Sequence, residues 1–148
     1  MKEMQIQFAP MTMLDVPDSL ILWKKTEGIC LREADSPQAL TQFLERNPGH
    51  SFVARDGSIL AGVALAGHDG RRGCLYHVAV AAHYRRCGIG TKLVANCLTS
   101  LENSGIRKCH LLVLKENVTG REFWAKLGWH FRPELDLMSF TCSGAENA

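Results

Sequence analysis

Two arginines and two glycines stand together in residues 85–91, directly before a stretch whose apolar spacing predicts a helix. N–H groups at a helix start lack intrahelical partners, and the helix dipole favours negative charge there. Glycine lets the backbone approach a ligand closely. This pattern predicts a cradle for a phosphate or pyrophosphate group, made of Arg85, Arg86, Cys87, Gly88, Ile89, Gly90 and Thr91. The same residues also fit an ordinary surface turn, so the motif alone leaves both interpretations open.

The spacing around these glycines excludes two common phosphate loops. The dinucleotide fingerprint needs a third glycine where Leu93 stands. The P-loop needs a lysine and then a serine or threonine after its last glycine, whereas Thr91 precedes Lys92 here.

The elements that would position this stretch are predicted from apolar periodicity and turn residues. Helices are expected over residues 15–26, 37–46, 89–101 and 118–127. Strands are expected over residues 6–8, 51–55, 58–67, 74–80, 109–114, 129–131 and 135–140. The order β-α-α-β-β-β-α-β-α-β-β predicts an α+β fold, with a mixed sheet of about seven strands and helices on both faces. We expect one domain over residues 1–141 and a loose tail over 142–148.

Composition and spacing argue against several kinds of partner for this chain: nucleic acids, membranes and metals are not expected. The chain has 148 residues, with 17 lysines and arginines against 15 acidic residues, so its charge is close to balance. A nucleic-acid partner is therefore not expected. No apolar run reaches the length of a signal peptide or a membrane span, so we expect a cytoplasmic protein without a membrane partner. No metal is expected, since strand alternation would put Cys74 and His77 on opposite faces.

The cradle resembles a known family motif. Arg85-Arg86-Cys87-Gly88-Ile89-Gly90 matches Gln/Arg-x-x-Gly-x-Gly/Ala, the acetyl-coenzyme A signature of the GCN5-related N-acetyltransferase (GNAT) superfamily. Residues 117–129 are similar to its second signature, Asn-x-x-Ala-x-x-Phe-Tyr-x-x-x-Gly-Phe, and the predicted element order is that of a GNAT-like fold. Residues 46–49 and 68–73 also resemble an uncharacterised bacterial branch of the superfamily.

The resemblance implies a function. It points to direct transfer of an acetyl group from acetyl-CoA to a primary amine of a small molecule or peptide. The alternative is an acyl-CoA-binding sensor module of the same fold that is weakly active or inactive. The exposed terminal strands that we expect would also allow a homodimer.

The resemblance also assigns roles to residues. The acetyl oxygen would be held by the backbone N–H groups of Val78, Ala79 and Val80, and the pyrophosphate by those of residues 86–91. Asn117 would contact the pantetheine arm, although a plain helix N-cap explains it equally well.

Two positions depart from the family pattern. Trp124 stands where many members have a tyrosine acid, so it would shape the thioester pocket or simply fill the core. Leu112 stands where one branch has a glutamate base. His77 is the best remaining base, because imidazole exchanges protons near neutral pH. By alternation it shares a face with Leu75 and Ala79, where a lone histidine is more often a hydrogen-bonded core residue than a base. Tyr76, Glu116 or a water chain are further candidates.

Overall fold

The computed structural model describes residues 3–148, so the first two residues of the predicted domain 1–141 lie outside it. The strands are β1 (Ile6–Pro10), β2 (Phe52–Asp56), β3 (Ile59–His68), β4 (Gly73–Val80) and β5 (Cys109–His110). They form one sheet in the order β1-β2-β3-β4-β5, in which β5 runs parallel to β4 and the other pairs are antiparallel. The sheet is therefore mixed, as predicted.

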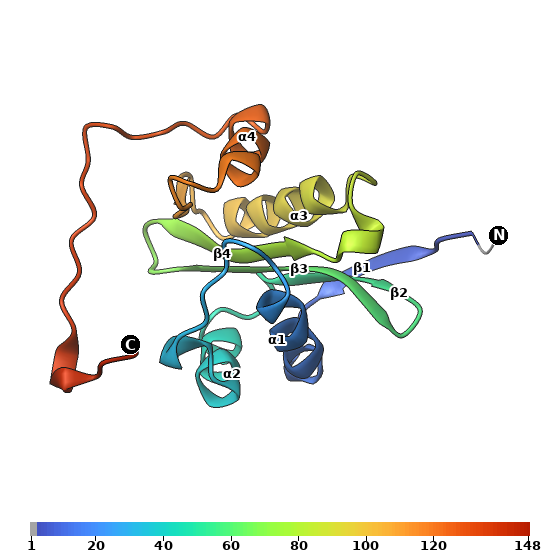
Figure 1. Cartoon of the computed structure of the whole chain (residues 1–148), viewed down its shortest axis with the longest axis horizontal. Coiled ribbons are helices and arrows are strands. Elements are labelled where there is room, and N and C mark those ends of the chain that lie inside the picture. The colour runs from blue at the N-terminus through green and yellow to red at the C-terminus, as the bar shows by residue number, and fades with distance from the viewer. Residues whose placement is uncertain (1–2) are drawn as a thin grey trace.

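Four helices cover the two faces of the sheet (Figure 1). They are α1 (Val16–Lys24), α2 (Pro37–Arg46), α3 (Ile89–Asn103) and α4 (Val118–Lys126). Helices α1 and α2 lie on one face, α3 lies on the other, and α4 lies beyond α3 (Figure 1). Short 3-10 turns are η1 (Met13–Asp15), η2 (Glu33–Asp35), η3 (Ala82–Tyr84) and η4 (Cys142–Gly144). The predicted α+β class with helices on both faces is confirmed.

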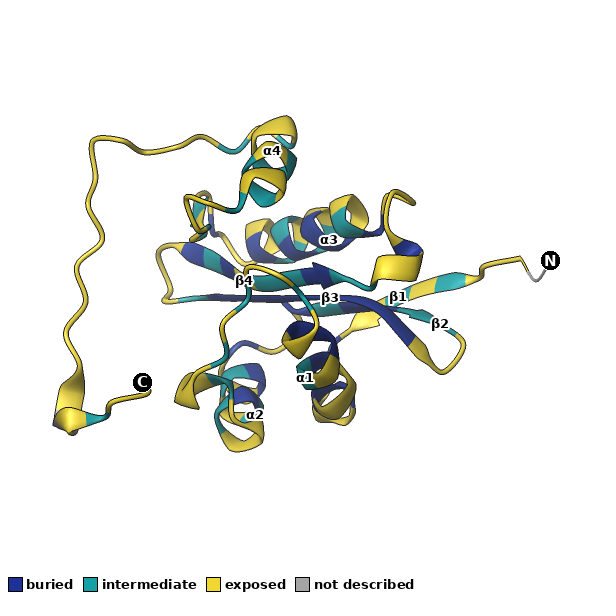
Figure 2. Cartoon of the chain, in the orientation of Figure 1, coloured by how far each residue is buried: buried dark blue, intermediate teal, exposed yellow. Residues whose placement is uncertain are grey.

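The core consists of two layers, one on each side of the sheet. On the α3 side, Leu93, Cys97 and Leu101 are fully buried against the strands. On the other side, Trp23 and Leu40 are buried beneath α1 and α2. Strand β3 is buried along nearly its whole length (Figure 2), because helices cover both of its faces.

Helix α1 is fixed to the sheet at its first turn. The guanidinium group of Arg55 on β2 donates to Asp15 at 2.8 Å and to Asp18 at 3.1 Å. Asp15 also accepts from the backbone N–H of Thr12 at 2.9 Å, which closes a capping box at the turn before the helix. These bonds set the position of α1 and of Trp23 near its end.

The C-terminal part of the fold differs from the prediction. Strand β5 ends at His110 rather than at residue 114, and residues 3–148 contain neither of the predicted strands at 129–131 and 135–140. Residues 129–141 instead form an extended arm that stands off the sheet (Figure 1). Met138 and Phe140 on this arm are both 91% exposed. The apolar pattern was suited to strands, but a strand forms only where a neighbour pairs with its backbone.

The arm ends beside η2. The backbone N–H of Glu33 donates to the carbonyl oxygen of Asn147 at 2.9 Å, and the Arg32 guanidinium donates to the Asn147 side chain at 3.2 Å. The predicted tail, residues 142–148, thus contains a 3-10 turn and a contact with the body of the protein.

No helix within residues 3–148 is both long enough and apolar enough to cross a membrane. The cytoplasmic location expected from the sequence stays a prediction.

Candidate active site

Strand β4 contains a bulge at His77. The pairing of β4 with β3 is regular up to Tyr76 opposite Leu65, then shifts before Ala79 opposite Val63. His77 has a φ of 51°, in the left-handed region that costs a non-glycine residue about 1–3 kcal/mol. The indole N–H of Trp23 donates to the His77 carbonyl oxygen at 2.7 Å, so α1 holds the bulge in place.

Because of the bulge, the neighbours that share a face with His77 differ from those predicted by strand alternation. Leu75 packs into the core on the α3 side, whereas Ala79 packs on the α1 side. The His77 ring contacts the Trp23 ring on the α1 side, with 5.2 Å between ring centroids. His77 therefore shares a face with Ala79 but not with Leu75, because the extra residue of a bulge breaks strand alternation.

Strands β4 and β5 separate directly after the start of β4. Gly73 and Cys74 pair with Cys109 and His110, and no later residue of β4 pairs with β5 in the described part of the chain. The β5-facing edge of residues 75–80 is thus free to bind a ligand. The side chains of Val78 and Val80 pack against the α3-side core, which leaves their backbone groups for the predicted role.

The His77 ring is held by an aspartate that the sequence reasoning did not single out. Its Nε2 lies 2.8 Å from Oδ1 of Asp35 in η2, and the two side chains are 21% and 11% exposed. Asp35 is far from His77 in sequence and stands on the loop between α1 and α2. Its position just before Ser36 and Pro37, which begin α2, gives no sequence signal of a site.

The predicted cradle forms a compact turn at the end of β4. Arg86 and Gly88 both have left-handed backbones, with φ values of 63° and 78°. Gly88 is the N-cap of α3 and contributes no side-chain cap, so the first N–H groups of α3 remain open to a ligand. Arg85, Arg86, Cys87 and Gly88 are exposed, while Ile89 is buried in the core. Arg85 also donates from Nε to the Val80 carbonyl oxygen at 3.1 Å, which ties the turn to β4.

The second glycine of the motif has a packing role. A Cβ on Gly90 would lie 3.3 Å from the ring of Phe123, so the missing side chain allows α4 to approach the start of α3. Asn117 caps α4, where its Oδ1 accepts from the Gly120 N–H at 3.0 Å. The amide group of Asn117 also lies against Gly28, whose Cβ would stand 2.8 Å from it. The loop after α1 therefore reaches the start of α4 beside the free edge of β4.

The positions that depart from the family pattern lie away from the His77 ring. The Trp124 ring packs between the rings of Phe123 and Trp129, whose centroids lie 5.0 and 5.2 Å from its own. This packing favours the interpretation that Trp124 fills the core. Leu112 is 75% exposed and lies outside β5.

The two other candidate bases are less suitable than His77. Glu116 is exposed in the loop before α4. Burial and the neighbouring Cys74 raise the pKa of Tyr76 to about 12, so its phenol keeps its proton and is a poor base.

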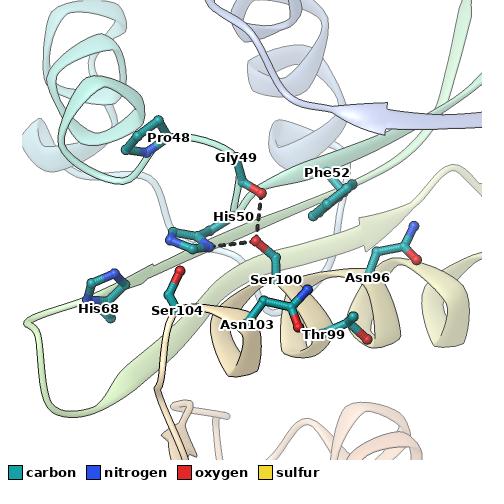
Figure 3. Close-up of a pocket in the computed structure, with 10 residues that line it drawn as sticks. All are labelled: Pro48, Gly49, His50, Phe52, His68, Asn96, Thr99, Ser100, Asn103 and Ser104. Carbon is teal, nitrogen blue, oxygen red and sulfur yellow. Dashed lines mark hydrogen bonds between the residues drawn. The ribbon is translucent and has the colours of Figure 1, made fainter.

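A separate pocket of about 710 Å³ lies between α3 and the start of β2 (Figure 3). Ser100 donates to the Gly49 carbonyl oxygen at 2.8 Å and lies 2.7 Å from Nδ1 of His50. Burial, together with the neighbouring His68, lowers the pKa of His50. None of the predicted site residues lines this pocket.

The described residues contain no group of three or more histidine, cysteine or acidic side chains placed to hold a metal ion.

Comparisons with known proteins agree with this arrangement. Residues 19–129 match the model of the acetyltransferase (GNAT) family. An acetyltransferase of Sodalis glossinidius is 26% identical over 125 residues, which are 84% of this chain and 87% of that protein. The structure of Ard1 from Thermoplasma volcanium matches with a TM-score of 0.74 and 14% identity, over 83% of this chain and 81% of that one.

A further structure, AAC(6')-Iy in complex with the bisubstrate analogue CoA-S-monomethyl-acetylneamine, matches with a TM-score of 0.72 and 18% identity, over 93% of this chain and 99% of that one. These structures share the fold. The family model, however, spans most of the chain, including the bulged strand, the cradle and α4. This chain therefore belongs to the acetyltransferase (GNAT) family.

Proposed function

We propose that this protein transfers an acetyl group from acetyl-CoA to a primary amine of a small molecule or peptide, by direct attack of the amine on the thioester. One observation carries the proposal: the free edge of the bulged strand β4 runs directly into an anion-binding turn. The edge suits the extended pantetheine arm and thioester, and the turn suits the pyrophosphate.

The coenzyme would be held mainly by backbone groups. The open N–H groups of residues 86–91 would bind the pyrophosphate, with positive charge supplied by Arg85 and Arg86. The N–H groups of Val78 and Val80 would face the thioester oxygen, which gains negative charge as the amine attacks, whereas the N–H of Ala79 between them is directed toward β3. With the coenzyme bound in this way, Asn117 would lie beside its pantetheine arm. AAC(6')-Iy, which shares the fold, was solved with a CoA–amine analogue, and this supports both substrates.

His77 would act as the base. An alkylammonium group has no lone pair for attack, so one proton must leave the amine first. After that proton moves to His77, the nitrogen attacks the carbonyl carbon and the C–S bond breaks. The second proton of the nitrogen can neutralise the departing CoA thiolate. The reaction therefore balances without a tyrosine acid at position 124.

A second candidate is a sensor that binds acyl-CoA without catalysis. It is favoured by Trp124 and Leu112, because the first packs in an aromatic cluster and the second lies exposed outside β5. Neither can supply the acid or base that other members of the family would have there.

The test measures release of free CoA thiol from acetyl-CoA over a panel of small amines and peptides. We expect turnover with at least one amine and a loss of about 100-fold in kcat for His77→Gln. His83→Gln is the matched control, because His83 is exposed in η3 at the end of the same strand. Tight binding of acetyl-CoA with no turnover on any acceptor would contradict the transferase and support the sensor.

We also propose that two chains form a homodimer through the arm. The arm exposes Leu137 and Phe140, and the edge of β5 lacks a neighbour among the described residues. In a twofold dimer, the arm and the β5 edge of each chain would both be covered by the partner, because each chain carries both surfaces.

A further inference from the structure

We propose that Asp35 is a positioning residue for the acetyl transfer: it fixes the His77 ring so that Nδ1 is the nitrogen that receives the proton of the acceptor amine. The inference rests on the proposed function, in which His77 is the base. It adds a residue on the loop between α1 and α2, a part of the chain in which the sequence revealed no catalytic signal.

The bond between the two side chains determines which ring nitrogen is available. Nε2 of His77 and Oδ1 of Asp35 are 2.8 Å apart. An ionised carboxylate only accepts hydrogen bonds, so Nε2 carries the hydrogen. In the neutral ring Nδ1 then holds the lone pair. Within residues 3–148, Nδ1 has no hydrogen-bond partner, so it is free for an incoming ammonium group.

Asp35 is itself rigidly placed. Its second carboxylate oxygen, Oδ2, accepts from the backbone N–H of Arg32 at 2.9 Å, and its own N–H donates to the Arg32 carbonyl oxygen at 2.9 Å. One oxygen thus anchors the carboxylate to the turn η2 while the other holds the imidazole. Because the Asp35 side chain is only 11% exposed, water competes little for these bonds.

The backbone of His77 is held from the opposite side. Trp23 donates to its carbonyl oxygen at 2.7 Å and lies against its ring. The left-handed backbone of His77 is unfavourable alone, and it persists because α1 and η2 together fix the residue.

The charged environment of the ring is simple. Asp35 is the one charged side chain bonded to it in the described structure, and it approaches from η2. From α1 the ring meets the neutral indole of Trp23. The preceding residue on β4, Tyr76, keeps its phenolic proton, because burial raises its pKa to about 12. Removal of the Asp35 charge should therefore act directly on the protonated ring.

The test compares wild type, Asp35→Asn, His77→Gln and the double variant, with Glu33→Gln as the matched control in the same turn. Asn can donate to Nε2 and so place the ring hydrogen on Nδ1. We expect Asp35→Asn to lower kcat by roughly ten-fold or more and to leave the Kd of acetyl-CoA within about two-fold. The double variant should be no slower than His77→Gln, because Asp35 acts through the ring.

A second readout does not depend on turnover. Nitrogen-15 NMR of the His77 ring should show hydrogen on Nε2 in the neutral wild-type protein, and Asp35→Asn should change that state. Normal turnover in Asp35→Asn would overturn the role of Asp35 alone, as would a wild-type ring with its hydrogen on Nδ1. Absence of turnover in wild type would overturn the proposed function and this inference together.

Discussion

The indole N–H of Trp23 donates to the carbonyl oxygen of His77 across 2.7 Å, and this bond joins helix α1 to the bulge of strand β4. Trp23 is completely buried, and a buried carbonyl oxygen that loses its donor costs about 1–3 kcal/mol. The bond therefore links the stability of α1 to the geometry of the proposed base.

Trp23→Phe should keep most of the packing but remove the donor. We expect a loss of about 1–3 kcal/mol in the free energy of unfolding and a fall in kcat of roughly ten-fold, because the bulge can relax. Urea denaturation and steady-state kinetics measure the two effects. Trp129→Phe is the control, since Trp129 packs on Trp124 and against the α3-side core, on the other side of the sheet from Trp23. Equal kcat values for Trp23→Phe and wild type would show that the bond is only structural.

Arg86→Glu should weaken acetyl-CoA binding. Arg86 is exposed in the cradle and its charge should face the pyrophosphate, so reversal should raise the Kd about ten-fold or more, an effect that added salt reduces. Calorimetric titration at low and high salt tests this. Arg71→Glu serves as the control, because Arg71 is exposed in the β3–β4 turn. Equal losses in both variants would mean that general charge, rather than the cradle, attracts the coenzyme.

Acetyl-CoA should protect Cys87 from alkylation. Cys87 is exposed within the cradle, whereas Cys30 and Cys142 are exposed elsewhere. Mass spectrometry of iodoacetamide-treated protein should show Cys87 protected by the ligand and the other two unchanged. Cys97 should stay unmodified throughout, because burial raises its pKa to about 12 and excludes the reagent. Unchanged labelling of Cys87 at saturating acetyl-CoA would place the ligand elsewhere.

Stability should decrease on mild acidification through His50. Burial and the nearby His68 lower the pKa of His50, so the unfolded chain takes up its proton at a higher pH than the folded chain. The free energy of unfolding should therefore fall as pH drops through about 6.5, the ordinary histidine value, and level off once the folded protein is protonated too.

Urea denaturation between pH 7.5 and 5 measures this slope. His50→Gln should flatten it, whereas His130→Gln, at an exposed position, should leave it unchanged. A slope in His50→Gln equal to that of wild type would assign the effect to other groups.

The double variant Leu137→Asp/Phe140→Asp should convert a dimer to a monomer. Both side chains are exposed on the arm, at 72% and 91%, so the charges should not disturb the folded body of the chain. Light scattering after size exclusion measures the mass. The control, Leu14→Asp, changes another apolar side chain that is 89% exposed, in η1. A monomeric wild type would contradict the proposed interface.

The parts of the fold that depend on local pattern could be predicted from sequence. Ser36 and Pro37 begin α2, and Gly128 follows α4, as their types predict. The turn of residues 85–91 and the helix start after it were predicted in the same way, because Arg86 and Gly88 lie within one short turn, whereas the binding of an anion there stays a prediction. Its chemistry depends on a helix start, which is also a local feature.

The parts that depend on distant partners could not be predicted. Asp35 meets His77 only because a loop crosses the sheet, and neither residue signals the other in sequence. The bulge at His77 carries no glycine, so strict alternation wrongly placed Leu75 on the same face as the ring, although it placed Ala79 correctly. Residues 135–140 alternate as a strand should, yet their pairing depends on a neighbour that the sequence pattern does not specify.

The contact between Asn147 and η2 has a practical consequence for work with this protein. The last residues lie beside the turn that carries Asp35, whereas the first strand, β1, lies at the opposite end of the molecule in the view of Figure 1. An affinity tag fused after Ala148 would begin next to the residues that contact η2 and would lie close to the turn that carries Asp35. Recombinant protein for substrate screening should therefore carry its tag on the N-terminal side, where added residues stay clear of the loop between α1 and α2.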